Sequence, residues 1–207
     1  STVVPYLQRI EKMLAGMLTR KPVRLDDVSD LVREQLFDVD LEGNDLNIWL
    51  YNTARIAISF GHVGVLVDAP KEGDKTRPYW VTYSPRDILG WRSEIIDGSR
   101  QLTQLRLLEN VIEPDGKYGE KQVKQIRVLE RGRYEIHRKD SKKGDYQLFD
   151  EGEMSLKDKI PFAVAYSNRV GYYESRSPLY DIAELNLKHY QIQSDLDNIL
   201  HISSVPL

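Results

Sequence analysis

The apolar residues change their period twice along the chain, at Gly61 and near Ser177. Before Gly61 they recur every three or four residues, as on one face of a helix; after it they alternate, as in strands. From Ser177 the helical period returns. This order predicts an α+β fold with a largely antiparallel sheet. We expect one domain over residues 1–176 and a projecting helix over residues 177–207.

Three helices are expected before Gly61. The third has a signal at each end, because Asn44 or Asp45 can serve as its N-cap and Gly61 stands where helices commonly end. Apolar residues surround this helix on most sides, so we expect it to be buried. The three expected helices cover residues 4–19, 28–36 and 45–60.

The middle of the chain is expected to form strands and hairpins. Residues 62–69 are apolar and β-branched and lie between Gly and Pro, which indicates a central strand. Asp97-Gly98 is a strong hairpin-turn signal, and Pro114-Asp115-Gly116 is a second turn. The further expected strands cover residues 78–83, 88–92, 101–113, 122–130, 133–138, 146–149 and, last, 160–166.

The C-terminal helix is expected to begin at Ser177, a good N-cap followed by a proline, and to reach about residue 202. A heptad-like seam with three- and four-residue steps runs along it, and we expect His189 to make a buried hydrogen bond there. We expect the seam to pack against a missing partner helix or a neighbouring subunit of a truncated chain. The alternative is a helix that docks on its own sheet. The seam consists of Ile182, Leu185, His189, Ile192, Leu196 and Ile199.

Composition excludes several classes of protein. The 207 residues contain no cysteine, which excludes disulfides, thiolate nucleophiles and Cys-type zinc sites. No stretch approaches the ~20 apolar residues that span a bilayer, so we expect a soluble protein. The net charge is −3, which disfavours tight electrostatic binding of DNA. The longest basic cluster, Arg138, Lys139, Lys142 and Lys143, is interpreted as a solvated hairpin tip.

Motifs for chemistry are also missing from the sequence. Gly61 and Gly64 lie between a helix and a strand, the reverse of a nucleotide-binding loop. The four histidines show no metal-ligand spacing, and no GxSxG elbow occurs. The carboxylate pairs Asp26-Asp27 and Asp38/Asp40 are typical of loops and helix N-termini. We interpret the aromatics Tyr79, Trp80, Tyr83 and Trp91 as strand packing. We therefore expect no enzyme, and no catalytic, cofactor-binding or metal-binding residue.

The order of several segments resembles the portal proteins of tailed bacteriophages. Residues 56–70 are similar to a buried helix that leads through glycine into a strand, and residues 77–92 to a strand that ends in a Pro-containing turn before Trp-Arg. Ile160-Pro161-Phe162 is similar to the family's Pro-Phe segment. Ser177-Pro178-Leu179 then opens a segment that is similar to the start of the stem helix, which ends near Val205-Pro206-Leu207.

This resemblance implies a portal wing over residues 1–176 and a first stem helix over residues 177–207, which leads to a truncated clip. The second stem helix and crown would be absent. It implies a ring, usually dodecameric, at one capsid vertex of the virion, assembled in the host cytoplasm. Double-stranded DNA would pass through non-specifically, and terminase, capsid and adaptor proteins would bind the full-length protein. Another phage structural or adaptor module and an unrecognised small-molecule enzyme remain alternatives.

Overall fold

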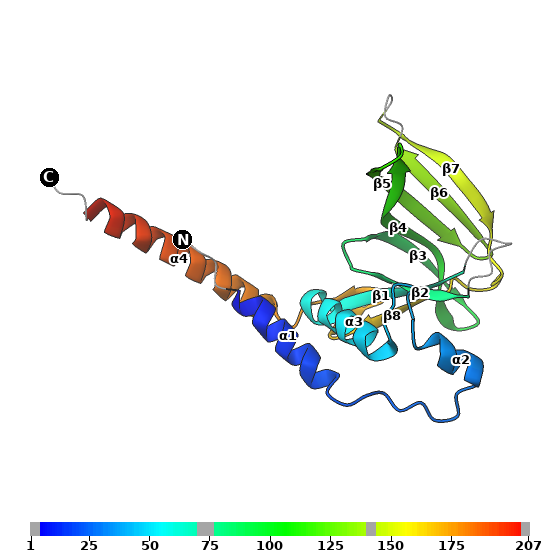
Figure 1. Ribbon diagram of the computed structural model, residues 1–207, viewed down its shortest axis with the longest axis horizontal. Helices are drawn as coiled ribbons and strands as arrows, with labels where there is room; N and C mark the ends of the chain where they lie inside the picture. Colours follow the sequence, from blue (N-terminus) through cyan, green and yellow to red (C-terminus); the bar gives the residue numbers. More distant parts are fainter. Residues whose placement is uncertain (1–4, 70–76, 140–143, 204–207) are drawn as a thin grey trace. The chain divides into compact units, whose positions relative to one another are not determined.

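The computed structural model describes residues 5–69, 77–139 and 144–203 (Figure 1). The fold is α+β, as predicted, with N-terminal helices, mostly antiparallel sheets and a C-terminal helix. The chain divides into two compact units: unit 1 comprises Ser1–Val63 and Val164–Leu207, and unit 2 comprises Gly64–Ala163. The C-terminal helix belongs to unit 1. The expected division after residue 176 separates a domain from the C-terminal helix and does not coincide with a boundary between these units. It stays a prediction.

Unit 1 contains four helices among its described residues: α1 (Tyr6–Leu18), α2 (Asp30–Gln35), α3 (Leu46–Phe60) and α4 (Tyr180–Ser203). The predicted end signals of α3 are confirmed. Asp45 Oδ1 accepts a hydrogen bond from the Ile48 N–H at 2.9 Å, and Gly61 follows the helix with a φ of +94°. Asp45 therefore satisfies a backbone donor that the helix leaves unpaired, and Gly61 adopts a left-handed conformation that costs other residues energy.

α3 is at least half-buried along most of its length, although only four of its residues are nearly fully buried. Its buried residues are Trp49, Thr53, Ala54 and Ala57, whereas Ile48 is 49% exposed. Three of the four are small, and α1 packs against α3 with its own small residue, Ala15, fully buried. Small side chains let the two helices approach closely along one face, whereas Ile48 lies on the exposed side of α3.

A three-stranded sheet has the order β2-β1-β8, with β1 (His62–Asp68) in the centre as predicted. Its neighbours are β2 (Tyr79–Tyr83) and β8 (Phe162–Tyr166). β1 and β2 are antiparallel, with Gly64 opposite Tyr83. Within unit 2, Gly64 leaves room for the Phe162 ring, which occupies the place of a Cβ at this position. A glycine inside a central strand is thus explained by a ring that lies against the backbone.

A five-stranded antiparallel meander, β3-β4-β5-β6-β7, forms the rest of unit 2. Asp97 and Gly98 both have positive φ, at 50° and 74°, which is the geometry of a two-residue hairpin turn. The strands of this sheet are longer than predicted, and the pairing of β4 with β5 continues into the second turn signal, with Asp115 opposite Gly119. The strands are β3 (Ile88–Ile96), β4 (Ser99–Asp115), β5 (Gly119–Glu130), β6 (Arg133–Lys139) and β7 (Tyr146–Glu153).

A short hairpin of β9 (Arg169–Gly171) and β10 (Glu174–Ser175) follows β8 and was not predicted. It leads to Ser177, whose hydroxyl accepts a hydrogen bond from the Leu179 N–H at 3.1 Å and donates one to the Ile58 carbonyl at 3.2 Å. The capping hydroxyl is thus at the predicted residue, although α4 begins at Tyr180. The same hydroxyl ties the start of α4 to the end of α3 within unit 1.

Candidate functional site

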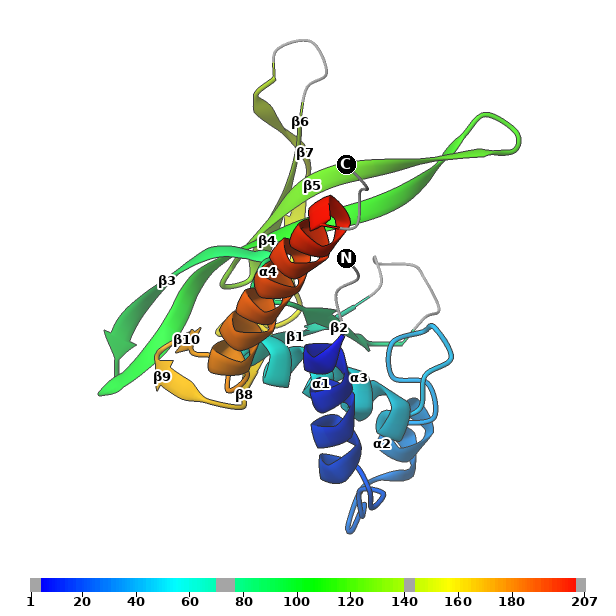
Figure 2. The same cartoon turned by 90° about the vertical axis from the view of Figure 1, so that its left-hand side faces the viewer.

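α4 has no buried residue in the described structure. In its first half, one face is half-buried near α1 (Figure 2). The Tyr6 ring meets the His189 ring edge-on, with centroids 6.3 Å apart. From residue 195 to 203 every residue is exposed. The half-buried face consists of Ile182, Ala183, Asn186, Tyr190, Gln193 and Ser194.

Four of the six predicted seam residues form an exposed apolar face on α4. Leu185, Ile192, Leu196 and Ile199 are 65%, 68%, 46% and 63% exposed. We call these four residues the α4 ridge. At about 100° per residue, the ridge lies roughly 130° around the helix from the half-buried face. Large aliphatic side chains on one exposed helix face mark a surface that a partner can cover.

The other two seam residues lie beside the ridge. Ile182 is half-buried, and His189 is exposed and contacts Tyr6. Within the single chain the imidazole is exposed, so the expected buried hydrogen bond of His189 across the seam stays a prediction. Two carboxylates of α4, Glu184 and Asp195, border the ridge on its other side, together with Lys188. Glu184 accepts a hydrogen bond from Tyr180, which raises the pKa of that phenol.

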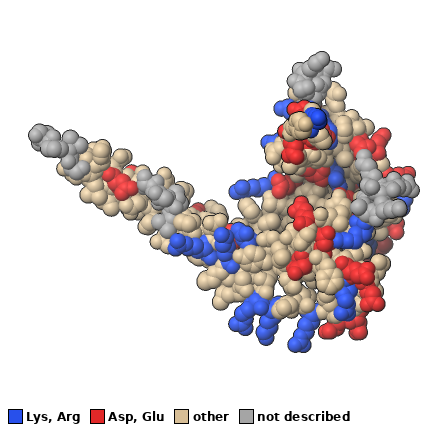
Figure 3. All heavy atoms as spheres, viewed as in Figure 1, with Lys and Arg blue, Asp and Glu red and all other residues tan. Residues whose placement is uncertain are grey.

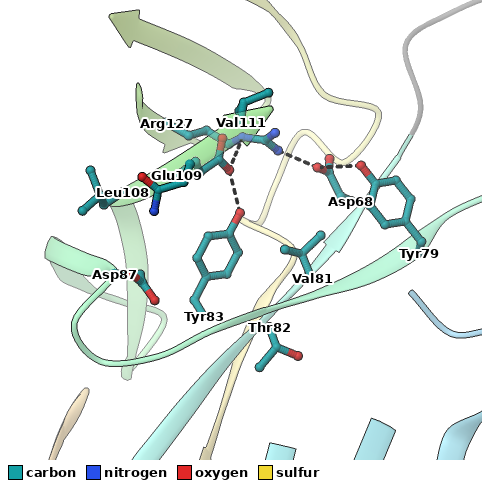
Figure 4. A pocket seen from close by; sticks show the side chains of 11 residues that line it. Asp68, Tyr79, Val81, Thr82, Tyr83, Asp87, Leu108, Glu109, Val111 and Arg127 are labelled. Atoms are coloured by element: carbon teal, nitrogen blue, oxygen red, sulfur yellow. Dashed lines mark hydrogen bonds and ion pairs between the residues drawn. The ribbon is translucent and has the colours of Figure 1, made fainter. Parts of the chain in front are cut away.

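Unit 2 contains a network of charged side chains around Arg127 of β5 (Figure 4). Arg127 Nη1 donates to Asp68 Oδ2 of β1 at 2.6 Å. Its Nε lies 2.9 Å from Glu109 Oε1 of β4. The Tyr83 hydroxyl donates to the same Glu109 oxygen at 2.6 Å, and Gln125 Nε2 donates to the other at 2.7 Å. Glu109 thus accepts two hydrogen bonds and forms an ion pair with Arg127.

The network continues to β6 and β7. Arg138 donates from Nε and Nη2 to Gln125 Oε1 at 3.1 and 3.0 Å and pairs with Glu113 at 2.7 Å. Its guanidinium also lies 3.6 Å from the centre of the Phe149 ring. Arg138 is therefore not part of a solvated basic tip, which corrects that interpretation. Lys139 ends β6 as an exposed residue, and Lys142 and Lys143 lie outside the described residues.

Burial and neighbouring charges set the protonation states of the network. Burial, followed by the negative charge of Glu109, raises the pKa of Tyr83 far above its usual value. Burial would lower the pKa of Arg127, but Glu109 and Asp68 outweigh it and raise that pKa. Tyr83 is therefore a neutral donor and Arg127 a permanent cation at neutral pH.

A hollow of about 370 Å³ lies beside these side chains, lined among others by Tyr79, Val81, Asp87 and Arg127. Several polar groups that face it have partners within the protein: Tyr79 reaches Asp68 at 3.4 Å, and Asp87 accepts from Ser84 Oγ at 2.7 Å. Groups that are bonded in this way stabilise a sheet.

A serine–histidine pair occurs in unit 1. His62 Nδ1 lies 2.6 Å from Ser175 Oγ, and the imidazole is 8% exposed. Burial lowers the pKa of His62, so the ring is neutral at pH 7. Ser175 Oγ also reaches the Phe60 carbonyl at 3.3 Å. The pair therefore ties β10 to the end of α3 and the start of β1.

Two further findings concern the described residues. No group of three or more His, Asp or Glu side chains among them is placed to hold a metal ion. None of their helices combines the length and the apolar character that crossing a membrane requires. Asp38 and Asp40 accept hydrogen bonds from Gly43 and Glu42, so this carboxylate pair orders the loop before α3, as its sequence context indicated.

Comparison with known proteins places one match on the helix that carries the ridge. A family described as "Domain of unknown function (DUF4055)" matches residues 178–207. No curated protein matches the chain. The matched segment begins one residue after Ser177 and includes the whole of α4.

Proposed function

We propose that this chain is part of a portal protein of a tailed bacteriophage, the head–tail connector whose subunits form a ring at one capsid vertex. The observation that carries the proposal is the α4 ridge, in which four large aliphatic residues are exposed on a projecting helix. Such a surface suits a subunit contact, because covering it removes apolar area from water. In this role the ridge packs against a neighbouring copy.

The proposal is also supported by where the portal-like segments fall. Residues 56–70 include the end of α3, Gly61 and β1, and residues 77–92 include β2, a turn and the start of β3. The Pro-Phe segment enters β8, and Ser177 caps the approach to α4. Each segment therefore has the kind of secondary structure that the resemblance implies.

The charges of the chain are compatible with DNA that moves. The net charge is −3, and the arginines at the centre of the unit 2 network are paired with carboxylates. Weak phosphate contacts would let a duplex slide, whereas a strongly basic channel would retain it. The proposal includes non-specific passage of double-stranded DNA. Terminase, capsid and adaptor proteins would contact the full-length protein at the capsid vertex.

The test is negative-stain electron microscopy of the full-length protein, with its mass measured in solution. We expect rings with a central pore wide enough for duplex DNA. Leu185→Asp/Leu196→Asp should abolish the rings, because two carboxylates would enter the subunit contact. The matched control is Gln191→Asp/Asn198→Asp, which adds the same charges to exposed positions of α4 away from the ridge.

Three results would contradict the proposal. Intact rings from the Leu185/Leu196 variant would remove the ridge from the subunit contact. Assemblies without a pore would favour another phage structural or adaptor module. A monomer at every concentration would turn attention to the enzyme alternative and to a search for ligands of the hollow in unit 2.

A further inference from the structure

α1 has an exposed apolar face of its own, bordered by basic residues. Met13 and Met17 are 56% and 67% exposed and lie one helical turn apart. We call these two residues, with their neighbours Arg9, Lys12 and Arg20, the α1 stripe. The three basic residues are exposed, and none of them has an ion-pair partner among the described residues.

The surroundings of the α1 stripe and the α4 ridge have opposite charge. Residues 6–24 contain five basic residues and one acidic residue, Glu11, which pairs with Arg55 at 2.7 Å. The basic side chains on the segment after α1 gather at the lower edge of the face shown in Figure 3. Tyr180–Ser203 contains four carboxylates and one lysine. Each surface therefore has an apolar centre and a charged border that the other complements.

Each border also holds a pair of like charges. Glu184 and Asp195 are eleven residues apart, which places them on nearly the same side of α4 and about 16 Å apart along its axis. Arg9 lies on α1, and Arg20 lies two residues past the end of that helix at Leu18. Each border can thus present two like charges to the other.

The two surfaces do not meet within one chain. α1 contacts its own α4 through Tyr6 and His189, about 50° around α4 from the centre of the ridge, and the four ridge residues stay exposed. The ridge and the α1 stripe are therefore both available to another molecule. Two α4 ridges facing each other would bring carboxylates together, which disfavours a symmetric pairing of α4 helices.

We propose that the α4 ridge of one copy docks on the α1 stripe of the next copy, a head-to-tail contact between two different surfaces. Contacts of this type close into rings when the rotation between copies allows it. The inference rests on the proposed ring for the existence of a second copy and adds the surface that receives the ridge. Met side chains suit this role, because they adapt their shape to the groups that cover them.

The test is a charge exchange in the full-length protein. One variant is Arg9→Glu/Arg20→Glu, and the second is Glu184→Lys/Asp195→Lys. Assembly is measured by sedimentation velocity over a range of concentrations. Each variant alone should raise the concentration at half-assembly at least tenfold, because like charges then face each other across the contact. Circular dichroism should show that both variants keep the wild-type helix content, since the four residues are exposed.

The decisive sample is an equimolar mixture of the two variants. Each variant then offers the other a ridge and a stripe of opposite charge, so the mixture should assemble as wild type does. A variant that carries all four substitutions should assemble without a second protein. Normal assembly of Arg9→Glu/Arg20→Glu by itself would overturn the inference that the ridge docks on the α1 stripe. If Leu185→Asp/Leu196→Asp still failed to assemble in that case, the proposed function would stand without this inference. If that charge variant assembles normally but loses binding to acidic lipid vesicles, the stripe is a membrane surface and the inference fails. A wild-type protein that never assembles would overturn both proposals.

Discussion

Replacing Arg127 by methionine tests whether the unit 2 network stabilises the fold. Arg127, Asp68 and Glu109 have side chains that are only 20%, 20% and 11% exposed, and the cation contacts both carboxylates. Removing one partner of a fully buried ion pair costs roughly 3–5 kcal/mol, because the remaining charge stays in a medium of low polarity. Since solvent still reaches these side chains, we expect the free energy of unfolding to fall by about 2–3 kcal/mol in Arg127→Met.

The assay is equilibrium unfolding in urea at pH 7 of four proteins: wild type, Arg127→Met, Glu109→Gln and the double variant. With a denaturant dependence of about 2 kcal/mol per molar urea, the single arginine variant should lose about 1 M in its midpoint. The double variant should be more stable than the sum of the two single losses predicts, by at least about 1 kcal/mol. The neutral amide introduced by Glu109→Gln has no charge for Arg127 to balance, so removing the guanidinium costs less in the double variant.

The control is Arg133→Met, which changes the same residue type in the same sheet. Arg133 pairs with Glu130 at 2.7 Å, but its side chain is 57% exposed, so the midpoint should not change measurably. The reasoning is refuted if Arg127→Met costs less than about 0.5 kcal/mol, or if the two substitutions prove additive. Either result would mean that water supports the two carboxylates as well as Arg127 does.

Three further predictions concern unit 1. Gly61→Ala should lower the free energy of unfolding by about 2 kcal/mol or more, because an added Cβ meets Ser175 Oγ at 2.5 Å and the backbone is left-handed. Gly43→Ala, at a φ of +86° in open space, should lower it by about 1 kcal/mol in the same thermal-unfolding series. Burial lowers the pKa of His62, so between that pKa and about 6.5 the unfolded chain binds more protons than the folded one. Stability should therefore decrease from pH 7.5 to 5.5, and urea midpoints of His62→Gln should show a smaller decrease. Asp45→Ala should lose about 1 kcal/mol and Asp45→Asn much less, as judged by urea unfolding.

The features that sequence alone predicted are those controlled by single residues or by period. Asp45 and Gly61 mark the two ends of α3, and Asp97-Gly98 marks a hairpin, because each of these positions needs a particular side chain or a positive φ. The four residues of the α4 ridge were predicted to share a face, because residues three, four and seven apart in a helix lie on one side. No tertiary context is needed for either inference.

The unit 2 network could not be predicted in this way, because its partners come from strands that are distant in sequence. A signal did exist. Leu105 and Leu107 are fully buried, and Glu109 continues the same face of β4. On β5, Gln125 and Arg127 occupy the same face as the buried Leu129. Charged residues at period-two core positions of two paired strands indicate a buried ion pair, but only when the register between the strands is known.

The size of the α4 ridge bears on how copies of the chain would associate. Complete burial of an aliphatic side chain is worth about 1.5–3 kcal/mol, and the ridge residues still have about half to two thirds of their surface to bury, so one ridge contact offers roughly 4–7 kcal/mol. Loss of translational and rotational freedom costs roughly 4–15 kcal/mol, so a single contact between two copies is close to break-even. In a closed head-to-tail ring every copy makes two such contacts, and the last contact forms without a further loss of freedom. Native mass spectrometry of the full-length protein across concentrations should therefore find monomers and one closed assembly, with few dimers or trimers. A continuous series of open oligomers of increasing size would mean that a single ridge contact is strong enough to hold two copies together, and that ring closure adds no stability.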